Sequence, residues 1–325
     1  MLAAVAASMV LCTGTLALGV GARHRHENRV QREEILGRGT MPHDEQRWRQ
    51  GPLNLLLLGS DSREGEPDQG QYPGQRSDTI MLAHLNGARD TATVVSVPRD
   101  SYVEVPAREG VWDGGKNKIN AAFAFGGAAL AAETVHRLTG VTIDGVLVAN
   151  FAAVRAIVNA VGGITVCLPH EVLSTTTGAR WSAGCHRLDG AAAEDLVRQR
   201  HNVPGGDLGR ILDQQIVVRA IAERLSPTSL IANPTRLDRL LTTAAGSLTV
   251  DKDLDLTDLA LAVRHVHPER LRLVTVPVSD PGFDTPVGSA VLLDSRPAAD
   301  LFAAIRDDTL DRWLAAHPQY VSVTD

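Results

Sequence analysis

The stretch RSDTIMLAHLNGARDTATVVSVPRD, Arg76–Asp100, predicts two strands joined by a tight turn. Residues 78–85 and 91–98 are apolar runs of strand length, and the Asn-Gly pair between them is a strong signal for a hairpin turn. The strands of a hairpin are antiparallel, so the start of the first and the end of the second lie at one edge of the sheet. Each of these ends carries an arginine and an aspartate, where neutral turn residues are usual. The sequence therefore predicts a charged site at that edge.

Apolar runs and helical periodicity around this hairpin predict an α/β fold. Residues 53–59, LNLLLLG, form a continuous apolar run ending in glycine, as expected of a strand buried on both faces. Residues 143–151 and 270–278 predict further strands, and the Ala-rich residues 119–139, followed by Gly140, predict a helix with a glycine C-cap. Because strands alternate with helices, we expect a three-layer α/β/α sandwich with a mixed central sheet.

The composition of the chain divides it into four segments. Of its 325 residues, 44% are hydrophobic and 22% are charged, which is ordinary for a globular protein. The first 22 carry no charge and are numerous enough to cross a bilayer. We expect a transmembrane anchor at residues 1–22, with a cleaved signal peptide or a buried helix as alternatives. A charged juxtamembrane stalk would follow at 23–50, then one catalytic-sized domain at 51–310 and a C-terminal tail at 311–325.

Two cysteines bear on the side of the membrane that this domain occupies. Cys167 and Cys185 flank a loop rich in Ser, Thr and Gly, which predicts a loop-closing disulfide and an oxidising compartment. The alternative is two unrelated buried thiols. The basic cluster at residues 23–29 would by itself place the domain in the cytoplasm, and a longer N-terminus carrying basic residues would remove this conflict. The anchor and the cysteine pair together favour an extracytoplasmic domain.

The charged strand ends suggest chemistry on phosphate. Asp61 follows the first strand, Arg76 and Asp78 precede the second, and Arg99 and Asp100 follow the third. Converging carboxylates repel unless a cation lies between them, and Mg²⁺ prefers such oxygen ligands together with substrate phosphates. Arginine offers paired donors that match phosphate oxygens. This pattern predicts a pyrophosphate bound through a metal, and the alternative is a set of solvated turns or ion pairs.

A second polar group lies in LVRQRHNVPGGDLGRILDQQ, residues 196–215. It supplies five side chains: Arg198, Arg200, Asp207, Arg210 and Gln214. The last three are spaced i, i+3, i+7, so they share one face of a helix. The two arginines are two positions apart and converge only if the preceding helix ends near Gln199. The alternative is the ordinary polar face of an exposed helix.

These motifs together resemble the LytR-CpsA-Psr family. LNLLLLGSDSR, RSDTIMLAHL, VVSVPRDSYVEVP, KINAAFAFGG and VRQRHNVPGGDLGRILDQQ occur in the family's order and approximate spacing, over residues 53–225. The resemblance implies a domain held outside the cell by one N-terminal transmembrane helix. It also implies a phosphotransferase that moves a glycopolymer, such as teichoic acid, capsule or arabinogalactan, from a polyprenyl-pyrophosphate carrier to peptidoglycan, forming a phosphodiester link.

The resemblance also implies roles for individual residues. Two carboxylates would hold Mg²⁺, with Mn²⁺ as the alternative: Asp61 and Asp78. Four arginines would contact the pyrophosphate: Arg76, Arg99, Arg198 and Arg200. Five residues match further polar positions of the site: Asp100, Lys118, Asp207, Arg210 and Gln214. We assign the general base to Asp207 or Asp100, and expect neighbouring guanidinium groups to lower the pKa of either carboxylate.

One residue departs from the family pattern close to this site. The family commonly has an arginine immediately before the Gln pair, where this chain has Asp213. Position 213 lies off the face that carries 207, 210 and 214. We therefore expect this departure to affect the rim of the site and not its chemistry. The cysteine pair resembles that of actinobacterial members, which favours arabinogalactan or a related wall polysaccharide.

The lipid carrier needs an apolar channel, which we expect between a helix and the sheet. The candidate lining residues, each with ordinary core packing as the alternative, are Phe123, Phe125, Leu130, Val148, Phe151 and Val154. The expected partners are the lipid-linked glycan, peptidoglycan and the membrane. A net charge of −6 argues against nucleic acid. A polyprenyl-pyrophosphate hydrolase and a non-catalytic, membrane-tethered regulator are the competing functions.

Overall fold

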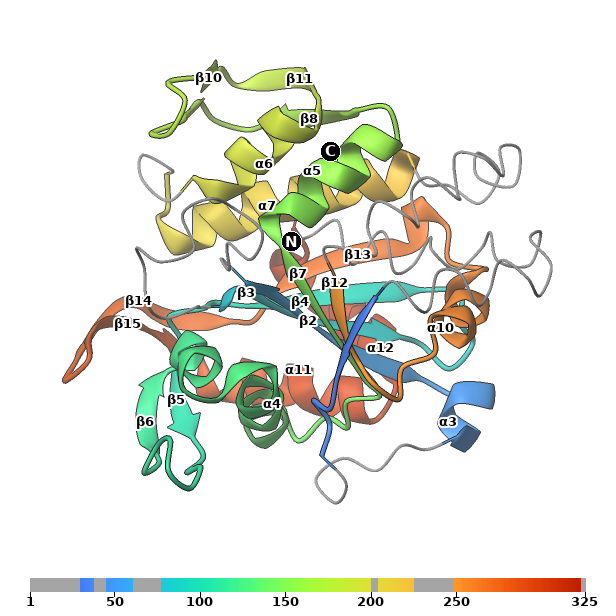
Figure 1. Cartoon of the computed structure of the whole chain (residues 1–325), viewed down its shortest axis with the longest axis vertical. Helices are drawn as coiled ribbons and strands as arrows, with labels where there is room; N and C mark the ends of the chain where they lie inside the picture. Colours follow the sequence, from blue (N-terminus) through green and yellow to red (C-terminus); the bar gives the residue numbers. More distant parts are fainter. Residues whose placement is uncertain (1–29, 38–44, 61–76, 200–203, 225–247, 323–325) are drawn as a thin grey trace.

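The protein is built on a seven-stranded sheet, seen in a computed structural model that describes residues 30–37, 45–60, 77–199, 204–224 and 248–322 (Figure 1). In sheet order, the strands are β1 (Gln31–Glu33), β12 (Leu248–Asp251), β7 (Gly145–Asn150), β2 (Leu53–Ser60), β3 (Ser77–Leu85), β4 (Ala92–Val97) and β13 (Leu271–Thr275). The central strands are rich in Leu, Val and Ile, and β2, β3 and β4 are buried along their whole length. Strands of this kind need cover on both faces.

The sheet is mixed, because β3 runs against both of its neighbours. β2 and β4 each pair with β3 in antiparallel orientation, whereas β2–β7 and β4–β13 are parallel pairs. The start of β3 therefore lies at the same edge as the ends of β2, β4 and β7. This confirms the predicted α/β fold with a mixed sheet, and the antiparallel pairing that the Asn-Gly turn predicted.

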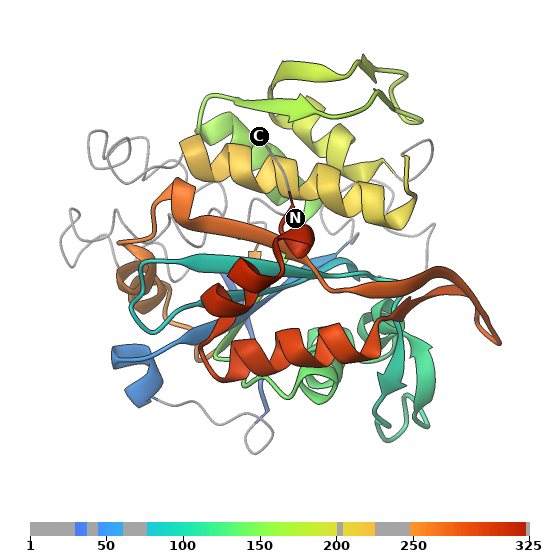
Figure 2. The same ribbon diagram turned by 180° about the vertical axis from the view of Figure 1, so that it is seen from behind.

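Helices cover the two faces of this sheet (Figures 1 and 2). One layer contains α5 (Phe151–Ala160), α6 (Gly190–Arg198) and α7 (Asp207–Arg224). The other contains α4 (Ile119–Thr139), α11 (Ser295–Arg306) and α12 (Leu310–Ala316). Shorter helices are α3 (Glu45–Arg49), α10 (Leu256–Val263) and the 3₁₀ turns Pro268–Arg270 and Pro318–Tyr320.

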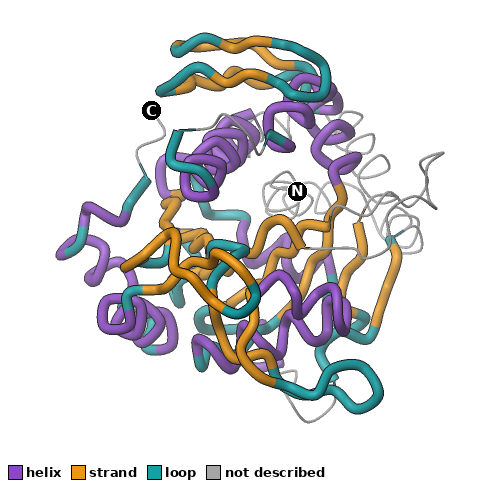
Figure 3. Tube along the Cα trace, turned by 90° about the vertical axis from the view of Figure 1, so that its left-hand side faces the viewer, coloured by secondary structure: helices purple, strands orange, loops and turns teal. Residues whose placement is uncertain are grey.

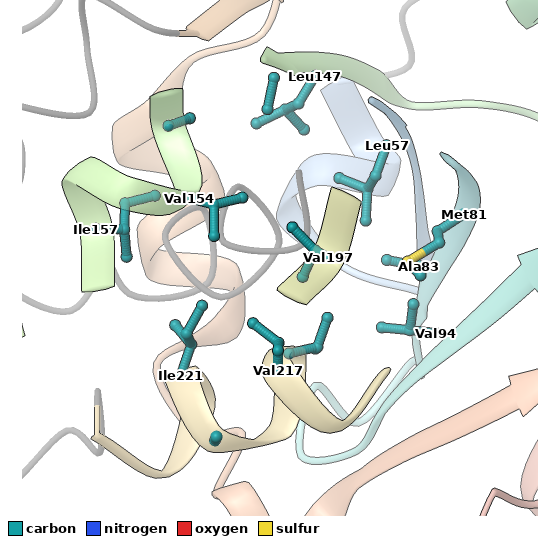
Figure 4. Packing of buried hydrophobic residues seen from close by; sticks show 14 of the residues in the cluster. Leu57, Met81, Ala83, Val94, Leu147, Val154, Ile157, Val197, Val217 and Ile221 are labelled. Carbon is teal, nitrogen blue, oxygen red and sulfur yellow. The ribbon is translucent and has the colours of Figure 1, made fainter. Parts of the chain in front are cut away.

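Alternation along β2 separates the apolar core into two clusters. Leu55 and Leu57 belong to the cluster under α5, α6 and α7, and Leu56 and Leu58 to the cluster under α4, α11 and α12. Figure 4 shows the first cluster, in which aliphatic side chains of the helices face those of the sheet. This is the period of two that a strand buried on both faces requires.

The helix α4 begins and ends as the sequence predicts, but it is kinked. Gly140 adopts the left-handed conformation, with φ at 65°, and its N–H donates to the carbonyl of His136, which forms the expected C-cap. Within the helix, Gly126 and Gly127 leave helical geometry, and Gly127 has φ at 64°. Residues with a β-carbon rarely adopt that conformation, so the glycine pair permits the kink.

The folded domain extends beyond the predicted boundaries on both sides. Residues 31–33, which we had placed in the stalk, form β1, and Ile35 is only 2% exposed. At the other end, Leu314 of the predicted tail is buried in α12. Among the described residues no helix is long and apolar enough to cross a membrane, and the predicted anchor at residues 1–22 lies outside them.

Within the described residues, four two-stranded antiparallel pairs lie outside the main sheet. They are β5 (Tyr102–Val105) with β6 (Gly115–Lys118), β8 (Ile164–Leu168) with β11 (Gly184–Leu188), β9 (Val172–Leu173) with β10 (Arg180–Trp181), and β14 (Val278–Thr285) with β15 (Gly288–Leu293). The β5–β6 and β14–β15 hairpins project on the same side of the molecule (Figure 1). The β8–β11 and β9–β10 pairs lie over the layer of α5 and α6 (Figure 3).

The predicted disulfide is confirmed. Cys167 in β8 and Cys185 in β11 face each other in the antiparallel register and are bonded, with an S–S distance of 1.97 Å. The bridge ties the two strands that cover α6 and α7. Their sequence separation is 18 residues.

We predict that loss of this bridge lowers stability without changing the fold. A loop of this size contributes roughly 3 kcal/mol by restricting the unfolded chain. Cys167→Ser/Cys185→Ser should therefore unfold at lower denaturant concentration than the oxidised wild type, as measured by circular dichroism. Wild-type protein treated with reductant should match the double variant. Equal unfolding midpoints for oxidised and reduced wild type would contradict the prediction.

Candidate active site

The register of β3 and β4 brings an aspartate and an arginine together. Ile80 pairs with Val97, so Asp78 at the start of β3 lies beside Arg99, two residues past the end of β4. The Nη1 of Arg99 donates to Oδ1 of Asp78 at 2.6 Å, and the Asp78 side chain is only 2% exposed. The charged edge predicted from the hairpin is therefore present. Asp78 at the start of β3 and Arg99 after the end of β4 are in direct contact there.

Two more carboxylates approach the same guanidinium group. The Nε of Arg99 lies 3.3 Å from Oδ1 of Asp207 and 3.6 Å from Oδ2 of Asp100. Burial opposes the charged form of Arg99, but Asp100, Asp78 and Asp207 outweigh this effect and raise its pKa above the ordinary value. The arginine thus stays charged and fixed in position.

The helix α7 presents its polar face to the start of β3. Arg210 forms an ion pair with Asp207 one turn earlier, at 2.6 Å, and donates to the main-chain oxygen of Asp78 at 3.2 Å. Gln214 accepts a hydrogen bond from the hydroxyl of Thr79 at 2.8 Å. The predicted shared face of positions 207, 210 and 214 is confirmed, and it faces the site and not solvent.

The beginning of α4 supplies the opposite side of the site. Its first residue follows Lys118, whose Nζ lies 3.8 Å from Oδ1 of Asp100. The Nδ2 of Asn120 donates to the same oxygen at 3.3 Å, and its main-chain N–H donates to the carbonyl of Arg99. Among the described residues, three carboxylates and three cationic side chains thus share this cluster, and their formal charges balance.

The direction of the pKa shift of Asp207 differs from the prediction. Burial raises the pKa of Asp207, whereas Arg210 and Arg99 lower it, and the net shift is upward. The prediction that neighbouring guanidinium groups lower this pKa was therefore wrong for Asp207, because the cost of burying the charge is larger than their attraction. Within the described part of the chain, its buried Oδ2 has no hydrogen-bond partner.

Arg198 has partners that the sequence did not predict. It ends α6, and Gln199 after it is extended, with ψ at 130°, so the expected helix end near Gln199 is confirmed. Its Nη2 pairs with Glu194 at 3.0 Å, and its guanidinium lies over the ring of Phe151, 4.5 Å from the ring centre. Three other candidates lie outside the described residues: Asp61, Arg76 and Arg200.

The six residues expected to line one lipid channel lie on opposite faces of the sheet. Four pack in or against the cluster under α4 and α11: Phe123, Phe125, Leu130 and Val148. Two belong to the cluster under α5, α6 and α7: Phe151 and Val154. The prediction of a single channel is therefore wrong, because β7 ends between them and the chain continues into α5 on the other face.

Two residues that hold the site together were missed. Thr79 fixes Gln214, as described, and the Nε2 of Gln215 donates to the Ser96 hydroxyl at 2.8 Å and to the carbonyl of Val274 at 3.1 Å. Gln215 is fully buried and connects α7 to β4 and β13. Gln215 could have been predicted, because it is a polar residue next to Gln214 at a helix position that faces the sheet.

Asp213 does not lie at a rim. Its side chain is 1% exposed, and Nε2 of His170, in the turn after β8, lies 3.3 Å from its Oδ1. Burial raises the pKa of Asp213 to about 6, and His170 opposes this shift. The prediction of a rim position was wrong, because the β8–β11 strand pair covers this side of α7. The unusual aspartate faces a histidine within the fold.

This buried carboxylate predicts a pH-dependent stability. The folded state takes up a proton on Asp213 near pH 6, and the unfolded state near pH 3.8. Its contribution to stability is therefore full below pH 3.8 and is lost as the pH rises through about 6, at up to about 1.4 kcal/mol per pH unit. Asp213→Asn should remove this slope in urea unfolding between pH 4 and 7.

Asp189→Asn is the matched control, because Asp189 caps α6 from an exposed position and asparagine caps equally well. It should keep the wild-type slope. If Asp213→Asn has the same pH dependence as the wild type, the assignment of the slope to Asp213 fails.

The site contains carboxylate oxygens, the type of ligand that a hard divalent cation prefers. Asp78, Asp100 and Asp207 bring carboxylate oxygens to one place, and the unmatched Oδ2 of Asp207 is such an oxygen. Among the described residues no group of three or more His, Cys, Asp or Glu forms a metal site by itself. Asp61, the second carboxylate of the predicted pair, lies outside them.

Taken together, these features define an α/β protein with a buried cluster of arginine and aspartate at one edge of a mixed sheet, where an anionic ligand can bind. The LytR_cpsA_psr family model matches residues 21–299, and the chain belongs to this family. The chain is 34% identical, over 264 residues, to "Probable cell wall biosynthesis protein LcpB" of Corynebacterium glutamicum, which covers 78% of this chain and 61% of LcpB.

Two further proteins, one compared by sequence and one by structure, are also similar to this chain. The chain is 33% identical over 204 residues to the "Polyisoprenyl-teichoic acid--peptidoglycan teichoic acid transferase TagU" of Enterococcus faecalis, covering 63% of each protein. The chain thus spans about three fifths of the length of these relatives. The crystal structure of TagV from B. subtilis has the same fold, with a TM-score of 0.65 at 24% identity, covering 81% of this chain and 98% of TagV.

Proposed function

We propose that this protein transfers a glycopolymer from a polyprenyl-pyrophosphate carrier to peptidoglycan. The observation that carries the proposal is the cluster around Arg99, whose charge is held in place by Asp78, Asp100 and Asp207. Such a cluster binds phosphate and stabilises charge without a nucleophilic side chain, which is what phosphoryl transfer needs. The printed names of LcpB and TagU, cell wall biosynthesis and teichoic acid transfer, support the same reaction.

The proposed reaction is a transfer at phosphorus. A hydroxyl oxygen of peptidoglycan attacks the phosphorus that carries the glycan, and the bond from that phosphorus to the bridging oxygen breaks. Polyprenyl phosphate leaves with the electron pair of that bond, and a phosphodiester joins glycan and peptidoglycan. Asp207 accepts the proton of the attacking hydroxyl, because its raised pKa makes it a better base than an ordinary aspartate. Arg99 and Arg210 orient the phosphates.

A divalent cation belongs to this proposal. Asp78, with Asp61, would hold Mg²⁺ or Mn²⁺ beside the phosphates. When bound, the ion would neutralise negative charge on the phosphate oxygens. The support is the pair of carboxylates, Asp78 of β3 and Asp207 of α7, that both contact Arg99, and the preference of Mg²⁺ sites for one or two carboxylates together with phosphate.

The polyprenyl chain is assigned to the face of the sheet covered by α5, α6 and α7. This face carries α7 with Asp207 and Arg210, and aliphatic side chains line it from both layers (Figure 4). Val154, Val197 and Val217 of the helices face Leu57 and Met81 of the sheet. Burying a chain of isoprene units requires such an aliphatic surface.

This assignment predicts the result of photocrosslinking. A polyprenyl pyrophosphate carrying a diazirine in its tail should label peptides of α5, α6 or α7 when irradiated with the full-length protein in detergent, as read by mass spectrometry. Excess unlabelled lipid should remove the labelling. Labelling confined to α4 and α11 would place the chain on the other face and contradict the assignment.

The location of the protein is part of the proposal. A membrane anchor at residues 1–22 would keep the site near its lipid substrate, with the domain on the extracytoplasmic side. The Cys167–Cys185 disulfide supports this side, because such bonds form in oxidising compartments. We propose arabinogalactan or a related wall polysaccharide as the glycan, on the similarity to the corynebacterial LcpB.

The test is transfer by the full-length protein in detergent. Radiolabelled lipid-linked glycan, peptidoglycan and Mg²⁺ should give labelled peptidoglycan with the wild type, and Arg99→Ala should lose about 10²–10³-fold in rate, the usual effect of removing a group that stabilises transition-state charge. The matched control is Arg180→Ala, which removes an exposed arginine paired with Glu171 in the β9–β10 hairpin. It should transfer at the wild-type rate.

The same assay separates the competing functions. Release of glycan phosphate without labelled peptidoglycan would favour a hydrolase, with water as the acceptor. Binding of the lipid-linked glycan without any turnover would favour a regulator. Equal transfer by the wild type and Arg99→Ala would contradict the proposed site.

A further inference from the structure

A pocket opens directly beside the Arg99 cluster, on the α4 side of the sheet. It has a volume of about 350 Å³, in the range of small-ligand sites. Its lining comes from four places in the chain: the end of β4, strand β6, the first turns of α4 and the tip of the β14–β15 hairpin. The lining residues are Arg99, Asp100, Asn117, Lys118, Asn120, Ala121, Ala124, Phe125 and Val287.

One part of the lining is polar, and its charged side chains are paired with one another. Asn117 and Asn120 present side-chain amides, and Asp100 lies between Lys118 and Arg99, so that its charge is compensated. The Oδ1 of Asn117 accepts from the N–H of Lys118 at 2.8 Å, and in the described part of the chain its Nδ2 forms no hydrogen bond. Amides and a carboxylate offer both donors and acceptors, as hydroxyl groups require.

The other part of the lining is apolar and rigid. Phe125 is stacked on Trp112 of the β5–β6 hairpin, with ring centres 4.4 Å apart and planes at 15°. The indole N–H of Trp112 donates to the carbonyl of Val105 at 3.3 Å, which fixes the ring pair. Val287, 40% exposed at the tip of the β14–β15 hairpin, forms the outer wall.

We propose that this pocket is a subsite for one sugar ring of the wall glycan that reacts at the Arg99 cluster. A pyranose presents hydroxyl and acetamido groups at its edge and C–H groups on its faces. Asn117, Asn120 and Asp100 match the first, and Phe125 with Val287 match the second. The inference rests on the proposed function, and it adds a specificity-determining site that the Arg99 cluster alone lacks.

The lining residues disfavour binding of the two other parts of the substrate, a phosphate and the polyprenyl chain, in this pocket. A second phosphate is disfavoured, because Asp100 and the two amides face the pocket. Among the described lining residues the cations are Lys118 and Arg99, and both are already paired with Asp100. A polyprenyl chain is disfavoured, because it would bury the Nδ2 of Asn117, which has no hydrogen-bond partner in the described part of the chain, against hydrocarbon. The sugar could belong to the donor glycan or to peptidoglycan, and the experiment distinguishes these sources.

The test uses full-length protein with Asn117→Ala and Val287→Ser. Both replace side chains that are partly exposed, so folding should be retained and is checked by thermal unfolding. The matched control is Phe283→Ser, an exposed residue of the same hairpin, 38% exposed, that does not line the pocket. Binding of the peptidoglycan disaccharide is read by saturation-transfer NMR, which needs no turnover. The Michaelis constants for lipid-linked glycan and peptidoglycan are measured separately.

For an acceptor sugar, both pocket variants should lose the NMR signal of the disaccharide and raise the Michaelis constant for peptidoglycan about two- to tenfold, the effect of one lost hydrogen bond or apolar contact. For a donor sugar, they should raise the constant for lipid-linked glycan by the same factor and leave the constant for peptidoglycan unchanged. Phe283→Ser should behave as wild type in every case.

If both pocket variants keep wild-type binding and both Michaelis constants, the subsite does not exist. If the wild type fails to transfer glycan but binds the disaccharide, and the pocket variants do not bind it, the proposed function fails while the sugar site stands. If the wild type transfers glycan and the variants are unaffected, only the subsite fails.

Discussion

The ion pair between Arg99 and Asp78 is the interaction on which the site depends. Both side chains are largely withdrawn from water, and taking a charge out of water is costly unless a partner and hydrogen bonds compensate it. Asp207 and Asp100 supply further compensation from α7 and from the end of β4. The cluster therefore assembles only when β3, the end of β4 and α7 are correctly packed. This packing in turn holds Arg99 in a fixed position at the edge of the sheet.

The reversed direction of β3 makes this pair possible. Ser77 starts β3 beside Ser60 at the end of β2, and the antiparallel register with β4 brings Asp78 beside Arg99. In a fully parallel sheet the start of β3 would lie at the opposite edge, about 27 Å away for a strand of nine residues. The position of α7 follows from the same arrangement, since Arg210 and Thr79 connect the helix to this strand end.

The sequence predicted those parts of the fold that depend on local signals. The Asn-Gly turn, the apolar runs of the central strands and the i, i+3, i+7 face of α7 each have a direct physical cause and are present. The β14–β15 hairpin was missed, because β14 contains a Pro-Gly pair that predicts a turn, and its register shifts accommodate that pair. The raised pKa of Asp207 and the buried Asp213–His170 contact depend on what covers α7, which residue spacing does not reveal.

The difference between the side chains on the two faces of the sheet suggests why the proposed reaction would occur at the edge of the sheet. Arg99 contacts Asp207 of α7 from one face, while its carbonyl and its neighbour Asp100 contact Asn120 of α4 from the other. An aliphatic surface lies on the first side and an amide-lined pocket on the second. A substrate that joins a hydrocarbon to a sugar through pyrophosphate has this same polarity along its length. In the proposed function, placing the lipid and the sugar on their matching sides would leave the pyrophosphate at Arg99, between the two sides.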